Sequence, residues 1–377
     1  MKKLIALALL LASLFALSGC RNKDKYYEPV ESTKEEATTV MTLKYGKKTY
    51  EVKYELYRAL FLTYRDEVSG GDNSVWQGPN KDEYIEKIQA RILERVADIY
   101  SAIALADELG LKPYSNDVEK EIKEYVKISV DGGAKGDTTF DGYGDYDAYL
   151  ASLKALYLNY SAQALIFRYA IVSDMVDKYY MGELTEDQIA SGVEGNPEGK
   201  LSYTKENVLE FYNSDKSVRI LRTFVSEDMD LNPEARAERV REAILNASWG
   251  GEEAVRYAMI DQGSTTAVPE LEAGYVMGMY NLSGTYYEEM AREAFALEDG
   301  GVSEVIRVHD GERMSYYILY RAPKSNEHFE ENYPSIAYVY LRNEIGKKYE
   351  HCAADLKANV SYTDFLKNLD HSGISMD

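Results

Sequence analysis

The stretch Ala291-Arg-Glu-Ala-Phe-Ala-Leu-Glu-Asp-Gly-Gly-Val-Ser-Glu-Val-Ile306 combines the end of a helix, a stop and the start of a strand. Its first half has apolar residues at helical spacing, which predicts one buried face. Gly300 and Gly301 can adopt the positive φ that ends a helix. Residues 302–308 and 314–321 predict two extended segments, joined by the turn chemistry of His309-Asp-Gly-Glu312. We therefore expect a helix, a glycine stop and a β-hairpin.

In the residues before this stretch, the spacing of apolar residues alternates between that of a strand and that of a helix. This order predicts a compact α/β unit. Val218-Arg-Ile-Leu-Arg-Thr-Phe-Val225 is apolar and predicts a strand. Asn232-Pro233-Glu234 then predicts the start of a helix. A short helix over 252–259 and the segment Gly274-Tyr-Val-Met-Gly278 follow.

Helical periodicity dominates on both sides of this unit. A hairpin is predicted at Met41–Val52, and helices are predicted over 53–68, 80–110 and 115–130 and, with a break near Asn159, over 145–181. Downstream, we expect a helix over 331–358 and a short strand at Val360–Tyr362.

The first twenty residues have the pattern of an export signal. Lys2 and Lys3 precede an apolar run over 4–17, which is too short to span a membrane comfortably. Leu17-Ser-Gly-Cys20 closes the run and resembles a bacterial lipoprotein box, which implies that Cys20 carries a lipid and becomes the mature N-terminus. The alternative is an ordinary signal peptide with a cysteine near its cleavage site. Residues 21–39 are polar and without periodicity, which predicts a flexible tether.

Composition narrows the classes of function. The 377 residues suggest about two domains of about 150 residues each. The net charge of −21 disfavours nucleic acid or an anionic lipid surface as a partner. With Cys20 lipidated, Cys352 has no partner for an intramolecular disulfide. The 34 tyrosines are too many for the core alone and fit either a client-binding surface or a compositional bias.

Metal and hydrolase sites find little support in the sequence. The four histidines, His309, His328, His351 and His371, are scattered, so we expect no metal site built on histidine. Residues 131–147 hold five aspartates among glycines, but their spacing does not fit an EF-hand, and a solvated loop is the preferred interpretation. Gly-x-Ser-x-Gly, His-Glu-x-x-His and P-loop motifs do not occur.

Residues 217–323, taken in order, resemble a parvulin-type prolyl isomerase domain. Gly274–Gly278 is similar to the family's Gly-Asp-Leu-Gly segment. The run Tyr286-Tyr-Glu-Glu-Met-Ala-Arg-Glu-Ala-Phe-Ala-Leu297 is similar to its helix ending in Ala-Phe-x-Leu, and Gly300–Ile306 to its Gly-x-Val-Ser turn. A lipid-anchored chain with helical flanks around such a unit resembles the PrsA/SurA-type foldases.

This second resemblance implies an α+β fold in which N- and C-terminal segments build one helical chaperone domain and the parvulin-like domain, an antiparallel sheet with helices, is inserted into it. The expected boundaries are a signal peptide at 1–20, a tether at 21–39, an N-terminal helical region at 40–200, a parvulin-like domain at 201–325 and a C-terminal helix at 326–377.

The family's site residues transfer position by position. Its two strand histidines fall on Arg222, or its neighbour Leu221, and on Tyr317, and its Cys/Asp position falls on Asp261 or Gln262. Its pocket methionine and phenylalanine fall on Tyr286 and Met290, for which a core role is equally open. Since both histidines are replaced, the resemblance implies weak or lost isomerase activity.

We therefore expect a lipid-anchored extracytoplasmic foldase, attached to the bacterial cell membrane, that binds unfolded or nascent exported proteins. A dimer is left open, and no cofactor, metal or nucleic acid is expected. The alternatives are an active prolyl isomerase and, more remotely, a solute-binding lipoprotein, which would need repeated βαβ units that the helical first half does not show.

Overall fold

A computed structural model describes residues 27–135, 138–182, 200–262, 274–280, 288–309 and 314–376, with the backbone only at 134–135, 138–140, 288–289 and 309. The described residues form two compact units. Unit 1 comprises those up to Val176 together with those from Tyr349 onward, and unit 2 comprises those of Asp177–Lys348. The leader with Cys20, as well as Tyr286, lies outside the described residues.

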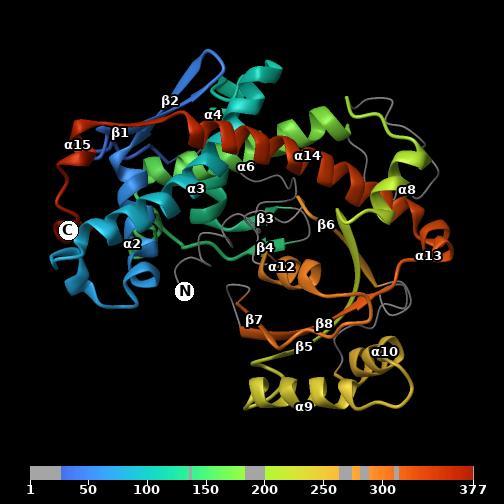
Figure 1. Cartoon of the computed structure of the whole chain (residues 1–377). Helices are drawn as coiled ribbons and strands as arrows, with labels where there is room; N and C mark the ends of the chain where they lie inside the picture. Colours follow the sequence, from blue (N-terminus) through green and yellow to red (C-terminus); the bar gives the residue numbers. More distant parts are fainter. Residues whose placement is uncertain are drawn as a thin grey trace. The chain divides into compact units, whose positions relative to one another are not determined.

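Unit 1 contains helices, a three-stranded sheet and a short hairpin (Figure 1). Two helices, α6 and α14, continue into unit 2. The elements are β1 (Thr39–Tyr45), β2 (Lys48–Lys53), α2 (Tyr54–Ser69), η1 (Asn73–Trp76), α3 (Lys81–Leu109), α4 (Asn116–Asp131), β3 (Gly133–Lys135), β4 (Thr138–Phe140), α5 (Tyr146–Ala155), α6 (Tyr160–Met181), α14 (Tyr333–Ala358), β9 (Val360–Tyr362), α15 (Asp364–Lys367) and η2 (His371–Gly373).

The sheet of unit 1 joins residues from both ends of the chain. Its strand order is β2-β1-β9, and both pairs are antiparallel. Leu43 in β1 faces Tyr50 on one side and Val360 on the other. Gly46, with φ of 55°, lies in the turn between β1 and β2. The predicted hairpin and the predicted C-terminal strand are thus confirmed as parts of one sheet.

Two contacts fix the C-terminal segment within unit 1. The thiol of Cys352 in α14 is fully buried and lies 3.7 Å from the carbonyl oxygen of Ser101 in α3. His371 is 5% exposed, and its Nε2 lies 2.9 Å from the Tyr57 hydroxyl of α2. Both contacts join residues more than 200 positions apart along the chain.

The acidic, glycine-rich segment 131–147 differs from the expected loop, because β3 and β4 form a short antiparallel hairpin within it. Gly142 takes a φ of 75°, and a Cβ there would lie 2.2 Å from the backbone nitrogen of Gly132. This close approach of two backbone segments explains why glycine is needed at that position. The hairpin depends on this backbone contact, and no periodic pattern in the sequence indicates it.

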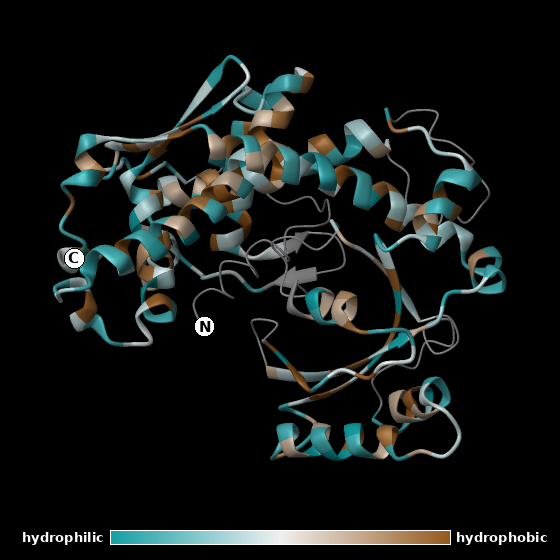
Figure 2. Ribbon diagram, in the orientation of Figure 1, coloured by the Kyte–Doolittle hydropathy of each residue, from teal (hydrophilic) through white to brown (hydrophobic). Residues whose placement is uncertain are grey.

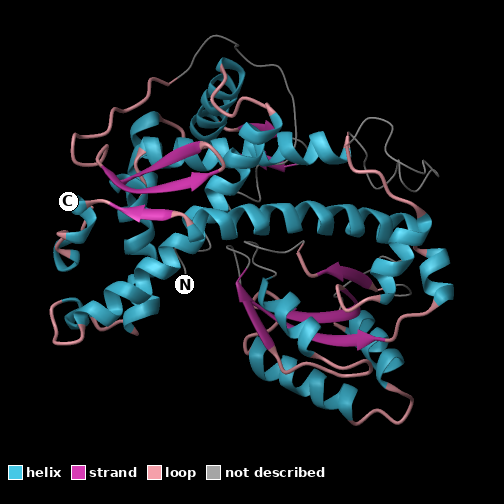
Figure 3. Ribbon diagram, turned by 45° about the horizontal axis from the view of Figure 1, so that its top comes forward, coloured by secondary structure: helices cyan, strands magenta, loops and turns pink. Residues whose placement is uncertain are grey.

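Unit 2 is built around a four-stranded antiparallel sheet of order β6-β5-β8-β7. Figure 3 shows these strands with helices on both of their faces. The elements that lie wholly in this unit are α8 (Lys205–Asn213), β5 (Ser217–Ser226), α9 (Pro233–Leu245), α10 (Gly251–Asp261), β6 (Tyr275–Gly278), α12 (Glu288–Ala296), β7 (Ile306–His309), β8 (Met314–Ala322) and α13 (Asn326–Glu331).

The two faces of this sheet pack against different helices, as alternation along a strand requires. Leu221 and Val225 of β5 join a cluster with α9 and α10, whereas Val218 and Ile220 join one with α12. Figure 1 shows α12 on one side of the strands and α9 and α10 on the other. Hydrophobic residues recur along β5 and β8 in Figure 2. Unit 2 therefore has two small cores separated by one sheet.

The end of β6 lies close to α14 within unit 2. The backbone N–H of Tyr280 donates to Oδ1 of Asn343 at 3.1 Å, and Asn343 is fully buried. A Cβ at Gly346 would lie 1.9 Å from the carbonyl oxygen of Tyr280. Glycine at this position is therefore what lets the backbone after β6 touch the helix.

The α+β fold class is confirmed. The helical unit is built from N- and C-terminal segments, and the unit with the four-stranded sheet lies between them in the sequence. The boundaries at residues 39, 200 and 325 remain predictions, and the two compact units divide within α6 and α14 instead. Residues 27–38, which belong to the predicted tether, lie in unit 1, where Glu36 pairs with Arg58 of α2 at 2.6 Å.

Candidate functional site

A cluster of one arginine and three aromatic rings lies on the α12 side of the sheet. Strand register brings it together, because Phe224 of β5 pairs with Tyr317 of β8, and Arg222 pairs with Leu319 two residues further along. Tyr275 joins from β6, where it pairs with Ile220. We call Arg222, Phe224, Tyr275 and Tyr317 the tyrosine–arginine cluster.

The guanidinium of Arg222 lies against two tyrosine rings. Its Cζ is 4.4 Å from the ring centroid of Tyr275 and 5.9 Å from that of Tyr317. Its Nη2 also donates to the Tyr275 hydroxyl at 3.4 Å. A cation over an aromatic face at such distances is stabilised by about 0.5–2 kcal/mol, depending on desolvation. The arginine is thus held in one orientation by its neighbours.

The members of the cluster differ in exposure. Tyr317 is 7% exposed and packs with Phe224, the ring centroids being 5.3 Å apart and the planes 35° apart. Arg222, Phe224 and Tyr275 are each half-buried. Solvent therefore reaches Arg222, Phe224 and Tyr275 in part, whereas Tyr317 is nearly covered.

Met290 has a different environment from the one that a pocket residue needs. It is 1% exposed and packs in the cluster that joins α12 to the sheet, together with Ala294 and Leu319. Phe295 packs against the same cluster and is partly buried. In this structure Met290 therefore holds the helix to the sheet. Tyr286, its predicted companion, is not among the described residues.

Asp261 is not brought to the tyrosine–arginine cluster. It ends α10, which covers the opposite face of the sheet, and its Oδ2 accepts a 2.6 Å hydrogen bond from Gln262. Gln262 in turn accepts from Nε of Arg236 in α9 at 2.7 Å. These three residues border a shallow pocket of about 340 Å³ between α9 and α10. Leu221, the alternative to Arg222, is fully buried on this same face.

Histidine does not take part in the cluster, whose four residues are an arginine, a phenylalanine and two tyrosines. Within the described part of unit 2, His328 lies in α13, where its Nδ1 is 2.9 Å from the Tyr212 hydroxyl. The side chain of His309 is not described. A site made of these four residues binds through aromatic faces and a permanent positive charge. It has no group that exchanges a proton near neutral pH.

Metal ligands do not converge in the described ranges, where no three side chains of His, Cys, Asp or Glu gather as a metal ion would require. Asp131, at the start of the acidic segment, is paired with Lys127 at 3.1 Å. Among the helices that the structure describes, none combines the length and the apolar character needed to cross a membrane.

Two members of the cluster were not predicted as site residues, namely Phe224 and Tyr275. Phe224 could have been predicted from the alternation of side chains along a strand. This alternation places Phe224 on the same face of β5 as Val218, Ile220 and Arg222. Tyr275 leaves no such clue, since its position beside Arg222 depends on how β6 pairs with β5 across 53 residues.

No protein-family model matches the chain, and no curated protein does. Three solved foldase structures are similar. PrsA from Streptococcus pneumoniae has 15% identity and a TM-score of 0.27, over 76% of this chain and 92% of that one. PrsA from Lactococcus lactis has 15% identity and a TM-score of 0.22, over 90% and 99%.

PrsA from Bacillus subtilis has 14% identity and a TM-score of 0.24, over 73% of this chain and 86% of that one. Since all three TM-scores lie below 0.5, these similarities carry no argument about function. Any functional conclusion therefore rests on the contacts of the chain's own residues.

Proposed function

We propose that this chain is a lipid-anchored extracytoplasmic foldase that binds unfolded segments of exported proteins and has weak or no prolyl isomerase activity. The observation that carries this proposal is the tyrosine–arginine cluster on the α12 side of the sheet. The leader that ends at Cys20 supports the export and anchoring parts of the proposal.

The chemistry of the cluster suits an extended peptide. Aromatic faces such as those of Phe224 and Tyr275 pack against proline rings and aliphatic side chains, as in other grooves that bind proline-rich segments. The guanidinium of Arg222 donates to carbonyl or carboxylate oxygens while remaining charged at any physiological pH. Neither contact requires a particular sequence, which fits a binder of many unfolded clients.

The same cluster argues for weak isomerase activity. Rotation about an X-Pro bond crosses a barrier of about 20 kcal/mol, and an enzyme lowers it by favouring the twisted amide over both planar forms. The family does this with a pair of histidines. Here Arg222 is stacked on Tyr275, and Tyr317 is only 7% exposed within the cluster. The donors that the cluster offers to a twisted amide are therefore the guanidinium of Arg222 and the hydroxyl of Tyr275, in place of a histidine pair.

Aggregation of a chemically unfolded model protein tests the binding function. We expect residues 21–377 to suppress light scattering at stoichiometric excess. Arg222→Leu should weaken client binding by about three- to tenfold, which corresponds to the loss of one hydrogen bond from the guanidinium to the client. Arg307→Leu is the matched control, since Arg307 is an exposed arginine of β7 whose neighbours Ile306 and Val308 face α12. Undiminished scattering would contradict the proposal.

A protease-coupled assay on an X-Pro peptide separates the two isomerase outcomes. We expect a rate close to the uncatalysed one. A rate well above it, lowered by Arg222→Leu and unchanged by Arg307→Leu, would instead establish an active isomerase. The anchoring is tested separately, because Cys20→Ala should move the full-length chain from the membrane fraction to the soluble extracytoplasmic fraction.

A further inference from the structure

Helix α10 of unit 2 has an exposed apolar surface as well as a buried one. The residues of α10 that pack against the sheet are Ala254, Val255, Ala258 and Met259. Tyr257 and Ile260 lie on the outer side of the helix and are 63% and 62% exposed. Residues three apart are neighbours on a helix surface, so these two side chains form one surface. A helix that covers a sheet normally has a polar outer side, so the fold does not account for this one.

Trp249 extends this surface from the loop before α10. It is 60% exposed, and its ring packs against that of Tyr257, with the centroids 5.7 Å apart and the planes 36° apart. Gly250, which separates Trp249 from the helix, takes a φ of 97°, a conformation that other residues rarely adopt. The two rings are therefore held together while both remain open to solvent.

The charge on this side of α10 is negative. Glu253 is exposed, lies one turn before Tyr257 and pairs with no cationic group in the part of the chain that the structure describes. Arg256, the arginine of α10, pairs with Glu252 at 2.8 Å, and Glu252 also pairs with Arg219 at 2.9 Å. Glu253 is thus an unbalanced charge on an aromatic surface. The α10 outer face, as we call it, comprises Trp249, Glu253, Tyr257 and Ile260.

Aromatic rings beside a carboxylate are suited to a cation. Lysine and arginine side chains are attracted to aromatic faces, and to indole most strongly. A nearby carboxylate such as that of Glu253 adds an ion pair. The aliphatic stems of these side chains also pack against apolar surface, which Ile260 provides on the same side of the helix. The α10 outer face therefore suits a cationic side chain that has apolar neighbours.

We propose that the α10 outer face is a second client site, which binds segments of unfolded proteins that carry lysine or arginine next to apolar residues. The proposal rests on the proposed foldase function. Charge argues for this occupant, because a second copy has the same net charge of −21 and an anionic membrane is also negative. The tyrosine–arginine cluster lies on the opposite face of the sheet (Figure 1). Unit 2 therefore presents aromatic rings with a positive charge on one face and with a negative charge on the other.

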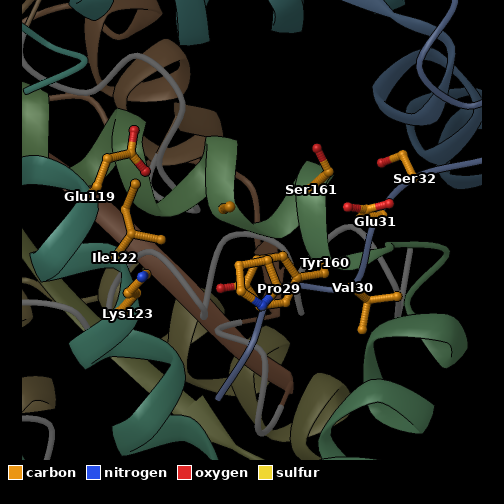
Figure 4. Close-up of a pocket in the computed structure, with 10 residues that line it drawn as sticks. Pro29, Val30, Glu31, Ser32, Glu119, Ile122, Lys123, Tyr160 and Ser161 are labelled. Carbon is orange, nitrogen blue, oxygen red and sulfur yellow. The ribbon is translucent and has the colours of Figure 1, made fainter. Parts of the chain in front are cut away.

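The pocket of unit 1 is the alternative place for a cationic segment and is less suited to one. Figure 4 shows its lining, in which Tyr160, Glu119, Lys123 and Glu31 are labelled. Tyr160 is only 7% exposed, so its face is not available to a ligand. Glu119 is already paired with Arg168 at 2.8 Å, and Lys123 repels a cation at the same pocket. Glu31, an exposed carboxylate, therefore provides a control position.

The exposure of Trp249 makes binding measurable by fluorescence. The chain has two tryptophans, and Trp76 is 5% exposed, so quenching by acrylamide reports mainly on Trp249. A short unstructured peptide of alternating lysine, leucine and serine should shield the indole of residues 21–377 from acrylamide. The same peptide with glutamine in place of lysine should bind about two- to fivefold more weakly, as expected for the loss of an exposed cation–π contact. Failure of the lysine peptide to shield Trp249 would overturn the site.

Variants of the α10 outer face test which residues bind the peptide, now labelled with fluorescein and followed by anisotropy. Glu253→Gln and Tyr257→Ser should each weaken binding by about two- to fivefold. Glu31→Gln and Leu231→Ser, at an exposed carboxylate of unit 1 and an exposed leucine outside α10, are the matched controls and should keep the affinity. Circular dichroism and Tm check that each variant folds. Equal losses in all four variants, or no loss in the first two, would refute the proposal.

Two other occupants give different results. Shielding of Trp249 that increases with protein concentration in the absence of peptide would assign the α10 outer face to a second copy of the chain. Shielding by phosphatidylglycerol vesicles, without shielding by the lysine peptide, would assign it to a membrane surface. Either result would overturn the proposal.

The peptide assay and the aggregation assay fail independently. A chain that binds the lysine peptide in a manner sensitive to Glu253→Gln, yet leaves client scattering unchanged, keeps the α10 outer face as a site and loses the foldase. A chain that suppresses scattering, but binds the peptide no better than its Glu253→Gln variant, keeps the foldase and loses this site.

Discussion

His371 is a histidine bonded through both of its ring nitrogens. Nδ1 lies 3.0 Å from the carbonyl oxygen of Leu369, which can only accept, so Nδ1 carries the proton. Nε2 then accepts from the Tyr57 hydroxyl at 2.9 Å. Burial lowers the pKa of His371, and the carbonyl of Leu369 and the charge of Asp370 only partly counteract it. The neutral ring is therefore the form that fits unit 1.

This predicts a loss of stability on mild acidification. The unfolded chain takes up a proton at His371 near pH 6.5, whereas the folded chain does so only at lower pH. The free energy of unfolding should therefore fall between pH 7.5 and pH 5.5, as urea midpoints would show. His371→Gln should flatten this dependence. His351→Gln, at a side chain that is 76% exposed, should keep it, and equal slopes in both variants would refute the assignment.

Cys352 gives a prediction about reactivity. Burial raises the pKa of its thiol to about 12, and a thiol reacts as the thiolate. In residues 21–377 it is the single cysteine. A chromogenic disulfide reagent at pH 8 should therefore leave the native chain unmodified for hours and react within minutes in urea. Rapid modification of the native chain would show that this part of α14 opens readily.

At the scale of residues, two of the predicted site positions lie together in the structure, although their role stays a prediction. The resemblance places the family's histidines on Arg222 or Leu221 and on Tyr317, and the structure has Arg222 and Tyr317 on one face of the sheet. Met290 could not be assigned to pocket or core from its pattern, because a helix residue that faces a sheet looks the same in both cases. The side chain of Met290 is only 1% exposed because of its tertiary packing, which the sequence pattern does not reveal.

At the scale of elements, local patterns predicted most helices and strands of unit 2. The Asn232-Pro233 start is confirmed, since the Asn232 side chain accepts from the N–H of Ala235 at the beginning of α9. The hairpin of β3 and β4 was missed, because aspartate and glycine are depleted in strands and its formation depends on close backbone contacts. A local pattern can predict that a segment forms a strand. It cannot predict which strand pairs with it, because the partner can lie far away in the sequence.

The contact between α14 and the backbone after β6 predicts that Gly346→Ala lowers stability, whereas Gly→Ala in a helix usually raises it. In a helix interior this change normally stabilises by about 0.5–1 kcal/mol. At Gly346 the new Cβ would meet the carbonyl oxygen of Tyr280 at 1.9 Å, so backbone must move. Gly346→Ala should therefore lower Tm, with an overpacking penalty of about 1–3 kcal/mol. Lys347→Ala, at an exposed neighbour, should leave Tm nearly unchanged, and a raised Tm in Gly346→Ala would contradict the contact.

At the scale of the whole molecule, unit 1 depends on residues from the two ends of the chain. β9 pairs with β1, and the Thr363 hydroxyl and backbone N–H both donate to the carbonyl oxygen of Val40 at 3.0 Å. No local pattern predicts this pairing, because a three-residue strand carries almost no periodicity. It was expected only from the resemblance to foldases with a discontinuous domain.

Truncation tests this dependence. A chain that ends at Asn359 lacks β9, α15 and the bond between His371 and Tyr57. Hydrogen exchange should show loss of protection in β1 and α2, while β5 and β8 of unit 2 stay protected. A chain that ends at Ile374 keeps all three features and should match the full chain. Retained protection in β1 after the longer truncation would contradict the structure.

The position of β1 between β2 and β9 has a consequence for a chain that is secreted amino-terminus first. In such a chain, residues 39–53 would cross the membrane early, but β1 would keep one open edge until residues 360–362 had also crossed. Unit 2 is complete in sequence before that moment. Under the proposed export, unit 2 can therefore fold at a stage when β1 still lacks its C-terminal partner strand.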